Sequence, residues 1–272
     1  MSRERMVATA GLWGAALTAV ILAMSFLLRL GTRIEADVAF SVLPPDVEQW
    51  ARLAHRIAAM AVGILAALAL VAVATERPMR RALLPPVATV VALTLLLSAI
   101  GRYTPGYRFD QVTVLNVVGG IGLAAAFWWL RESGGSGRRP DAVASAALGL
   151  LLVLATLGAC ADANAMRGTR AFVPMHLVFA PVFVITALFA AWRQRHRFVL
   201  AGALAALILT QVVLGFVLVA GPDMRAMMPA WIHGMIAMAV AFLLVSLAVG
   251  RPARSPAGDQ PGLRSALGSP GS

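Results

Sequence analysis

Long apolar runs alternate with short polar segments along almost the whole chain. Each run is close to the roughly 20 residues that a helix needs to cross the hydrocarbon layer of a membrane. Helices are expected because their backbone polar groups are satisfied within the segment. The pattern therefore predicts an all-α polytopic membrane protein with eight transmembrane helices. The runs lie near residues 6–28, 53–74, 84–100, 112–130, 142–160, 172–192, 198–220 and 230–249, and the third, which follows Pro85-Pro86, is the shortest.

Composition agrees with this pattern. Of the 272 residues, 60% are apolar and 13% are charged, whereas soluble domains are about half apolar and about a quarter charged. These values exclude a soluble globular enzyme, and so much apolar surface also excludes a disordered chain. Cys160 is the single cysteine, which excludes an intramolecular disulfide, an iron–sulfur cluster and a thiolate zinc site.

The net charge of +11 comes from 23 basic residues, all of them arginine, against 12 acidic ones. Arginine is enriched in the loops on one side of the predicted membrane, and the positive-inside rule makes that side cytoplasmic. Both termini are then cytoplasmic, as an even number of spans requires, and the charge gives no reason to expect a nucleic-acid partner. The cytoplasmic set is Arg3, Arg5, Arg77, Arg80, Arg81, Arg131, Arg138, Arg139, Arg193, Arg195, Arg197, Arg251, Arg254 and Arg264.

A glycine- and serine-rich segment at residues 132–140 divides the chain in the middle. It separates an N-terminal half, residues 1–131, from a C-terminal half, residues 141–250, and each half holds four apolar runs. This division favours an internal repeat made of two pseudo-symmetric four-helix bundles. The tail, residues 251–272, is rich in Gly, Pro and Ser, so we expect it to be disordered on the cytoplasmic side.

Three of the four histidines occupy similar positions in the pattern. His55, His176 and His233 lie near the starts of the second, sixth and eighth runs. Even-numbered runs all enter from the outer face, so these side chains should lie at one depth on parallel helices. The fourth, His196, lies among arginines in a cytoplasmic loop, where we expect a solvated side chain.

The repeat relates these histidines to one another. His55 and His176 are 121 residues apart, and the same spacing places the counterpart of His233 in the fourth run, where the polar residue is Asn116. The repeat thus predicts four equivalent positions, of which three carry an imidazole and one carries an amide.

Two histidines that face each other across a helix bundle suit haem, because a porphyrin iron takes one imidazole from each side. His176 and His233 are the predicted pair, whereas zinc would need three or four ligands. The alternative is that they are ordinary polar residues at helix ends near the membrane surface. The guanidinium groups of Arg56, Arg102 and Arg225 could bind the haem propionates or simply extend to lipid headgroups.

These residues resemble the heme A synthase family, and the resemblance covers nearly the whole chain except the tail. The motifs that carry it are Leu53-Ala-His55-Arg56, Met175-His176-Leu-Val-Phe-Ala180, Gln211-Val-Val-Leu-Gly-Phe-Val217 and Trp231-Ile-His233.

The resemblance implies an enzyme of a bacterial-type inner membrane that oxidises the C8 methyl of heme O to a formyl group, giving heme A for terminal oxidases. It implies that His176 and His233 bind heme b, with Arg56 and Arg225 as further cofactor-binding residues. His55 would be the catalytic residue at the substrate-haem site. Expected partners are the haem substrate, membrane lipid, and heme O synthase or oxidase assembly factors.

Two positions in the N-terminal half depart from the family pattern. The family has a histidine where this chain has Asn116, and a glutamate where it has Arg52. Glu48 lies a further turn out and could substitute only if the helix extends that far. An amide is a poor ligand for haem iron, so a haem at His55 would be five-coordinate, or else this site no longer binds haem.

Three hypotheses follow. The first is a heme A synthase-type oxidoreductase. The second is a non-catalytic relative that binds heme b and carries electrons or assists oxidase assembly. The third is a transporter in which arginines bind an anion, which broken helices near the middle of the membrane would favour.

Overall fold

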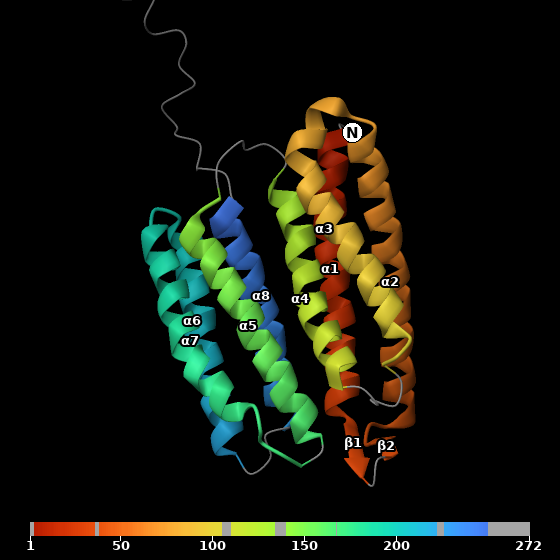
Figure 1. Cartoon of the computed structure of the whole chain (residues 1–272), viewed down its shortest axis with the longest axis vertical. Coiled ribbons are helices and arrows are strands. Elements are labelled where there is room, and N and C mark those ends of the chain that lie inside the picture. Colours follow the sequence, from red (N-terminus) through yellow and green to blue (C-terminus); the bar gives the residue numbers. More distant parts are fainter. Residues whose placement is uncertain are drawn as a thin grey trace, which may run out of the picture.

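The computed structural model describes residues 3–35, 38–104, 110–133, 140–166, 168–221 and 226–249. Within them the chain forms eight helices, each long and apolar enough to cross a membrane, and a short β-hairpin (Figure 1). The predicted polytopic helical membrane fold is therefore confirmed. The elements are α1 (Arg3–Leu30), β1 (Thr32–Glu35), β2 (Val38–Ser41), α2 (Pro45–Ala74), α3 (Arg77–Gly101), α4 (Asp110–Glu132), α5 (Ala142–Ala165), α6 (Val173–Arg193), α7 (Phe198–Ala220) and α8 (Met227–Val249).

Local sequence signals set several helix starts. Asp141 caps α5, because its carboxylate accepts hydrogen bonds from the backbone N–H groups of Val143 and Ala144 at 3.0 Å. Helices α2, α3 and α6 have proline in their first two positions, where the missing N–H costs nothing. The sequence predicted that the tail and the central linker are the segments without regular structure. The tail and most of the linker lie outside the described residues.

Two helices begin earlier than the apolar runs predicted. Helix α3 begins at Arg77 instead of near residue 84, and it passes through Pro85 and Pro86. Each proline removes one backbone hydrogen bond, and a transmembrane helix tolerates this where neighbouring groups supply other bonds. Helix α2 begins at Pro45, two turns before the apolar run, and so includes Glu48.

The β-hairpin between α1 and α2 is an element that the apolar pattern did not predict. Strands β1 and β2 pair antiparallel, with Thr32 opposite Ser41 and Glu35 opposite Val38. Only four residues form each strand, which is too short to give a clear alternation of apolar and polar side chains. The hairpin lies at the end of the molecule opposite the N-terminus (Figure 1).

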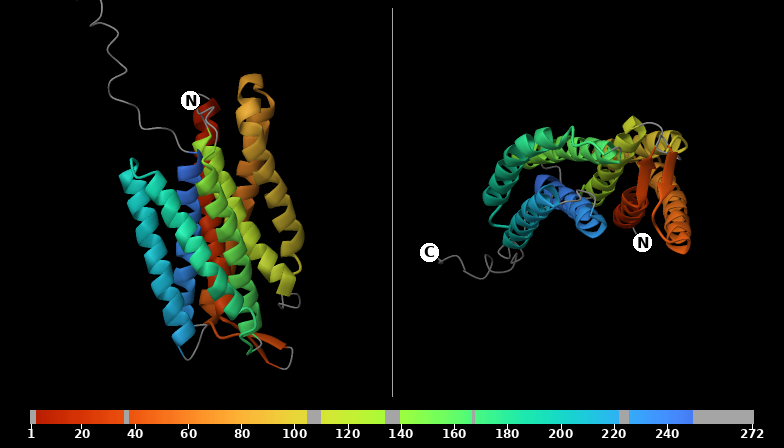
Figure 2. Two further views of the ribbon diagram at one scale, coloured as in Figure 1. Left: turned by 60° about the vertical axis from the view of Figure 1, so that its left-hand side comes forward. Right: turned by 90° about the horizontal axis from the view of Figure 1, so that it is seen from below.

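The eight helices form two four-helix groups with the same pairing of neighbours. In each group the first and third helices both contact the second and the fourth, and in the C-terminal group α6 also contacts α8. The two groups meet where α8 contacts α1 and α4, and where α4 contacts α5 (Figure 2). Two indole N–H groups cross this boundary: Trp128 donates to Ser246 Oγ at 2.7 Å, and Trp231 donates to the Ala23 carbonyl at 2.9 Å.

Small residues bring α1 and α4 into close contact. A Cβ added at Gly11 would lie 2.7 Å from the backbone nitrogen of Arg131 and 2.8 Å from the carbonyl oxygen of Phe127. Real Cβ atoms do not approach backbone so closely, so glycine at this position sets the separation of the two helices.

We predict that Gly11→Ala lowers the free energy of unfolding by about 1–3 kcal/mol, because the added methyl group overpacks a rigid backbone contact. Thermal unfolding in detergent measures the change. Gly63→Ala is the matched control, since a Cβ at Gly63 would meet no described atom within 4 Å. Equal stability of the two variants would contradict the prediction.

Candidate haem-binding cavity

A cavity of about 510 Å³ lies among the four helices of the C-terminal half, with α1 and α4 completing its wall. This volume is within the range of sites that enclose a whole small molecule. The lining is mostly aliphatic, and the polar side chains in it are few. They are Arg29, Asp162, His176, Gln211 and His233.

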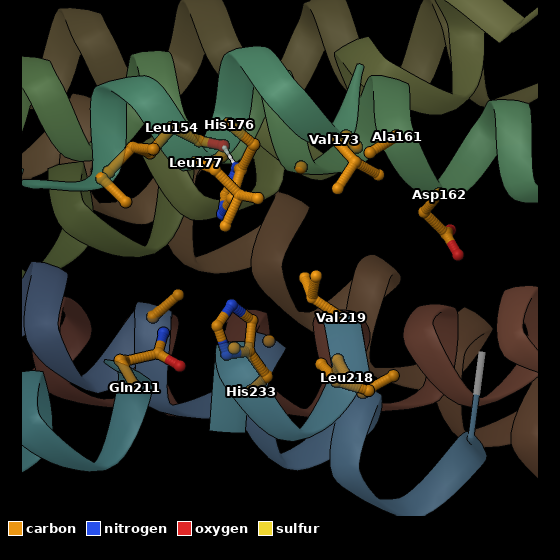
Figure 3. A pocket seen from close by; sticks show the side chains of 18 of the residues that line it. Leu154, Ala161, Asp162, Val173, His176, Leu177, Gln211, Leu218, Val219 and His233 are labelled. Atoms are coloured by element: carbon orange, nitrogen blue, oxygen red, sulfur yellow. Dashed lines mark hydrogen bonds between the residues drawn. The ribbon is translucent and has the colours of Figure 1, made fainter. Parts of the chain in front are cut away.

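His176 and His233 enter this cavity from opposite sides. His176 lies near the start of α6 and His233 near the start of α8. Figure 3 shows the two imidazole rings pointing toward each other across the cavity. The order of the spans predicted His55, His176 and His233 at one depth, and the structure brings His176 and His233 into one largely apolar cavity.

The backbone of α5 holds the His176 ring in place. Nδ1 of His176 lies 3.2 Å from the carbonyl oxygen of Leu154. A carbonyl can only accept, so Nδ1 carries the proton and Nε2 keeps its lone pair. Gly158, one turn after Leu154 on α5, lies beside this ring, where a Cβ would be in ordinary van der Waals contact with Cε1 of His176 at 3.4 Å.

A second glycine stands beside the His233 ring. A Cβ added at Gly215 of α7 would lie 3.8 Å from Cε1 of His233. In both cases a glycine on the preceding helix lies beside the histidine of the next one. Nδ1 of His233 differs from that of His176, because it is buried and has no hydrogen-bond partner within the described residues.

The N-terminal half repeats the contact of His176 with the preceding helix but has a different residue at the position equivalent to His233. Nδ1 of His55 lies 3.3 Å from the carbonyl oxygen of Ile21 on α1, so α2 contacts α1 as α6 contacts α5. The fourth equivalent position is different: the Asn116 amide donates to Thr104 Oγ1 at 2.7 Å, at the end of α3. His55 and His176 therefore share one tautomer, in which Nδ1 carries the proton.

A buried ion pair lies in the cavity wall. Nε of Arg29 is 2.6 Å from Oδ2 of Asp162, and the two side chains are 10% and 16% exposed. The Arg29 guanidinium also lies 4.9 Å from the centre of the Phe26 ring. Sequence reasoning missed this pair, because Arg29 was one of nine arginines on the outer side and nothing in the pattern linked the end of α1 to α5.

Of the arginines that the sequence assigned to haem, the two described ones, Arg56 and Arg102, do not line this cavity. Arg56 is exposed on α2, next to the surface ion pair of Arg52 with Glu48, in which Nη2 and Oε1 are 2.5 Å apart. Arg102 lies over the Tyr103 ring at 4.8 Å. Arg225 is outside the described residues, and His196 is exposed in the loop after α6.

Within the described part of the chain, no three His, Cys, Asp or Glu side chains are grouped so that they could hold a metal ion. Two imidazoles alone fit a metal that arrives with most of its ligands, as porphyrin iron does. No protein-family model and no curated protein matches this chain.

We predict that Asp162→Asn destabilises the protein by about 3–5 kcal/mol, because it leaves the buried Arg29 charge without its counterion. Glu48→Gln removes a carboxylate from a much more exposed pair, so its effect should be about 0–1 kcal/mol. Thermal unfolding of both variants checks the difference. A larger loss in Glu48→Gln would show that burial does not control the strength of these pairs.

Proposed function

We propose that this chain is a membrane haem protein that holds one heme b between His176 and His233 and acts as an oxidoreductase of the heme A synthase type. The observation that carries the proposal is the pair of imidazoles facing each other across a largely apolar cavity of about 510 Å³. Buried ionisable groups inside membrane proteins are costly and usually functional.

The residues of the cavity fit a haem in three respects. Nδ1 of His176 is held by a backbone carbonyl, which leaves Nε2 as the ligand atom. Gly158 and Gly215 lie beside the two rings and carry no side chain. The lining is mostly aliphatic, and Arg29 supplies a guanidinium at the wall that could bind a propionate in competition with Asp162.

The chain's own residues then have separate roles. When bound, heme b supplies a one-electron iron couple. His176 and His233 would fix the ring plane and keep the iron low-spin. The apolar wall would limit the access of water and the reorganisation of solvent around the iron. This favours electron transfer over the exchange of an iron ligand. The C-terminal half would thus hold the haem in a form suited to electron transfer.

The oxidation of heme O would take place in the N-terminal half, at His55. Its hydrogen bond to Ile21 reproduces that of His176, which favours a retained ligand role. With dioxygen as the oxidant, the net change balances as a methyl group and O₂ giving a formyl group and water. Asn116 would leave the opposite face of this haem without an imidazole.

A second candidate function is a non-catalytic heme b protein that carries electrons or assists oxidase assembly. Two contacts favour it. The Asn116 amide is engaged by Thr104. Glu48, two turns before His55, is the carboxylate that would stand in for the family's glutamate. It is paired with Arg52. Both contacts lie where the family would bind its substrate.

The proposed setting is a bacterial-type inner membrane with both termini in the cytoplasm. The described ends, Arg3 and Val249, lie at one end of the helix bundle (Figure 1), as eight spans require. The arginine-rich loops lie at the same end. The histidines would then be near the outer face, and heme O synthase or oxidase assembly factors would be the partners.

We predict that His176→Ala and His233→Ala each remove most of the bound heme b, because one axial imidazole is lost. The absorption spectrum and haem content of the purified protein measure this. His196→Ala is the control and should leave both unchanged. If His196→Ala bleaches the protein and His233→Ala does not, the ligand assignment is wrong.

We predict that co-expression with a heme O source gives extractable heme A, and that His55→Ala abolishes it while keeping the low-spin heme b signal. Two haems per chain, one of them high-spin, would accompany this result. One low-spin haem per chain and no heme A, under conditions where a known synthase works, would favour the electron carrier instead.

A further inference from the structure

Two buried polar atoms in the cavity wall have no hydrogen-bond partner within the described residues, and they are chemically complementary. They are Nδ1 of His233 and Oε1 of Gln211. The amide oxygen can only accept a hydrogen bond, whereas the ring nitrogen can carry a proton and donate one. Leaving both unsatisfied is costly in an apolar interior, so a bond between them would remove two penalties at once.

The two side chains come from neighbouring helices and face the same space. Gln211 is on α7, one turn before Gly215, and Gly215 is the residue that faces Cε1 of His233. Cε1 is bonded to both ring nitrogens, so this face of α7 meets the nitrogen-bearing edge of the ring. Figure 3 shows the Gln211 amide beside the His233 ring, on the same side of the cavity.

The other histidine shows what His233 lacks. Nδ1 of His176 donates to the Leu154 carbonyl, so the backbone itself fixes that tautomer. A histidine that binds a metal through one nitrogen almost always donates its other N–H to an acceptor, which fixes the orientation of the ring. His233 needs an acceptor of this kind if its Nε2 is to bind iron.

We propose that Gln211 is the positioning residue of His233: its Oε1 accepts the proton of Nδ1 and directs the lone pair of Nε2 toward His176. No hydrogen bond within the described residues holds Oε1 in place, so the Gln211 side chain can rotate toward the ring. The inference rests on the proposed heme b site. It adds a residue outside the pair of ligands that sets how strongly one of them donates to the iron.

The test uses the full chain, reconstituted with heme b in detergent. Gln211→Leu removes the acceptor at similar size, and Gln211→Glu replaces it with a stronger one. Thr210→Val is the matched control, because Thr210 is the next residue on α7, is exposed, and bonds only to its own helix at Ala206. Heme b affinity, midpoint potential and the low-spin electron paramagnetic resonance spectrum are the readouts.

We expect Gln211→Leu to weaken heme b binding about 10–100-fold and to raise the midpoint potential, since a less polarised imidazole stabilises the oxidised iron less. Gln211→Glu should retain binding and lower the potential below that of the unaltered protein. Thr210→Val should change neither. A steric role of Gln211 would not give potentials that move in opposite directions in the two variants.

Two results would overturn the inference. One is a Gln211→Leu protein with unchanged affinity, potential and spectrum. The other, decisive if Gln211→Leu fails to fold, is a Gln211→Glu protein whose potential equals that of the unaltered chain. Failure of the proposed function is distinguishable, because the unaltered protein would then bind no heme b, or would keep its six-coordinate spectrum in His176→Ala.

Discussion

The structure depends on one constraint: a polar group between membrane helices must find its partner inside the protein, because lipid offers none. The contacts between helices follow from it. The Trp231 indole donates to the backbone of α1, Arg29 pairs with Asp162, and His176 donates to the backbone of α5. The same constraint makes Gln211 and His233 conspicuous, since each has a buried atom for which the described residues provide no bond.

The two halves share one arrangement of helices but differ in the side chains at equivalent positions. His55 and His176 retain the same contact with the helix before them, so the fold preserves the orientation of both rings. The fourth positions, Asn116 and His233, no longer match. An amide satisfied by Thr104 has become part of the packing, whereas His233 remains free to act on something within the cavity. One position thus differs between the halves: it carries an amide in the N-terminal half and an imidazole in the C-terminal half.

Hydrophobic periodicity predicted the helices and the repeat because membrane insertion acts on whole segments of about 20 residues. It could not predict the hairpin of β1 and β2, or the course of α3 through Pro85 and Pro86, since these depend on contacts between segments. The site divides in the same way. Spacing singled out His176 and His233, whereas the pairing of Arg29 with Asp162 and the place of Gln211 beside His233 came only from the packing of α1 and α7. No sequence pattern specifies which of several arginines a distant helix will reach.

Helix α1 has a consequence for how the protein is made. It precedes α5 to α8 in the chain, yet Phe26, Arg29 and Leu30 line the cavity of the C-terminal half, and Ala23 accepts the bond from Trp231 on α8. The wall of this cavity is therefore incomplete until α8 has packed against α1. Any molecule that needs the whole cavity must bind after α8 has been inserted.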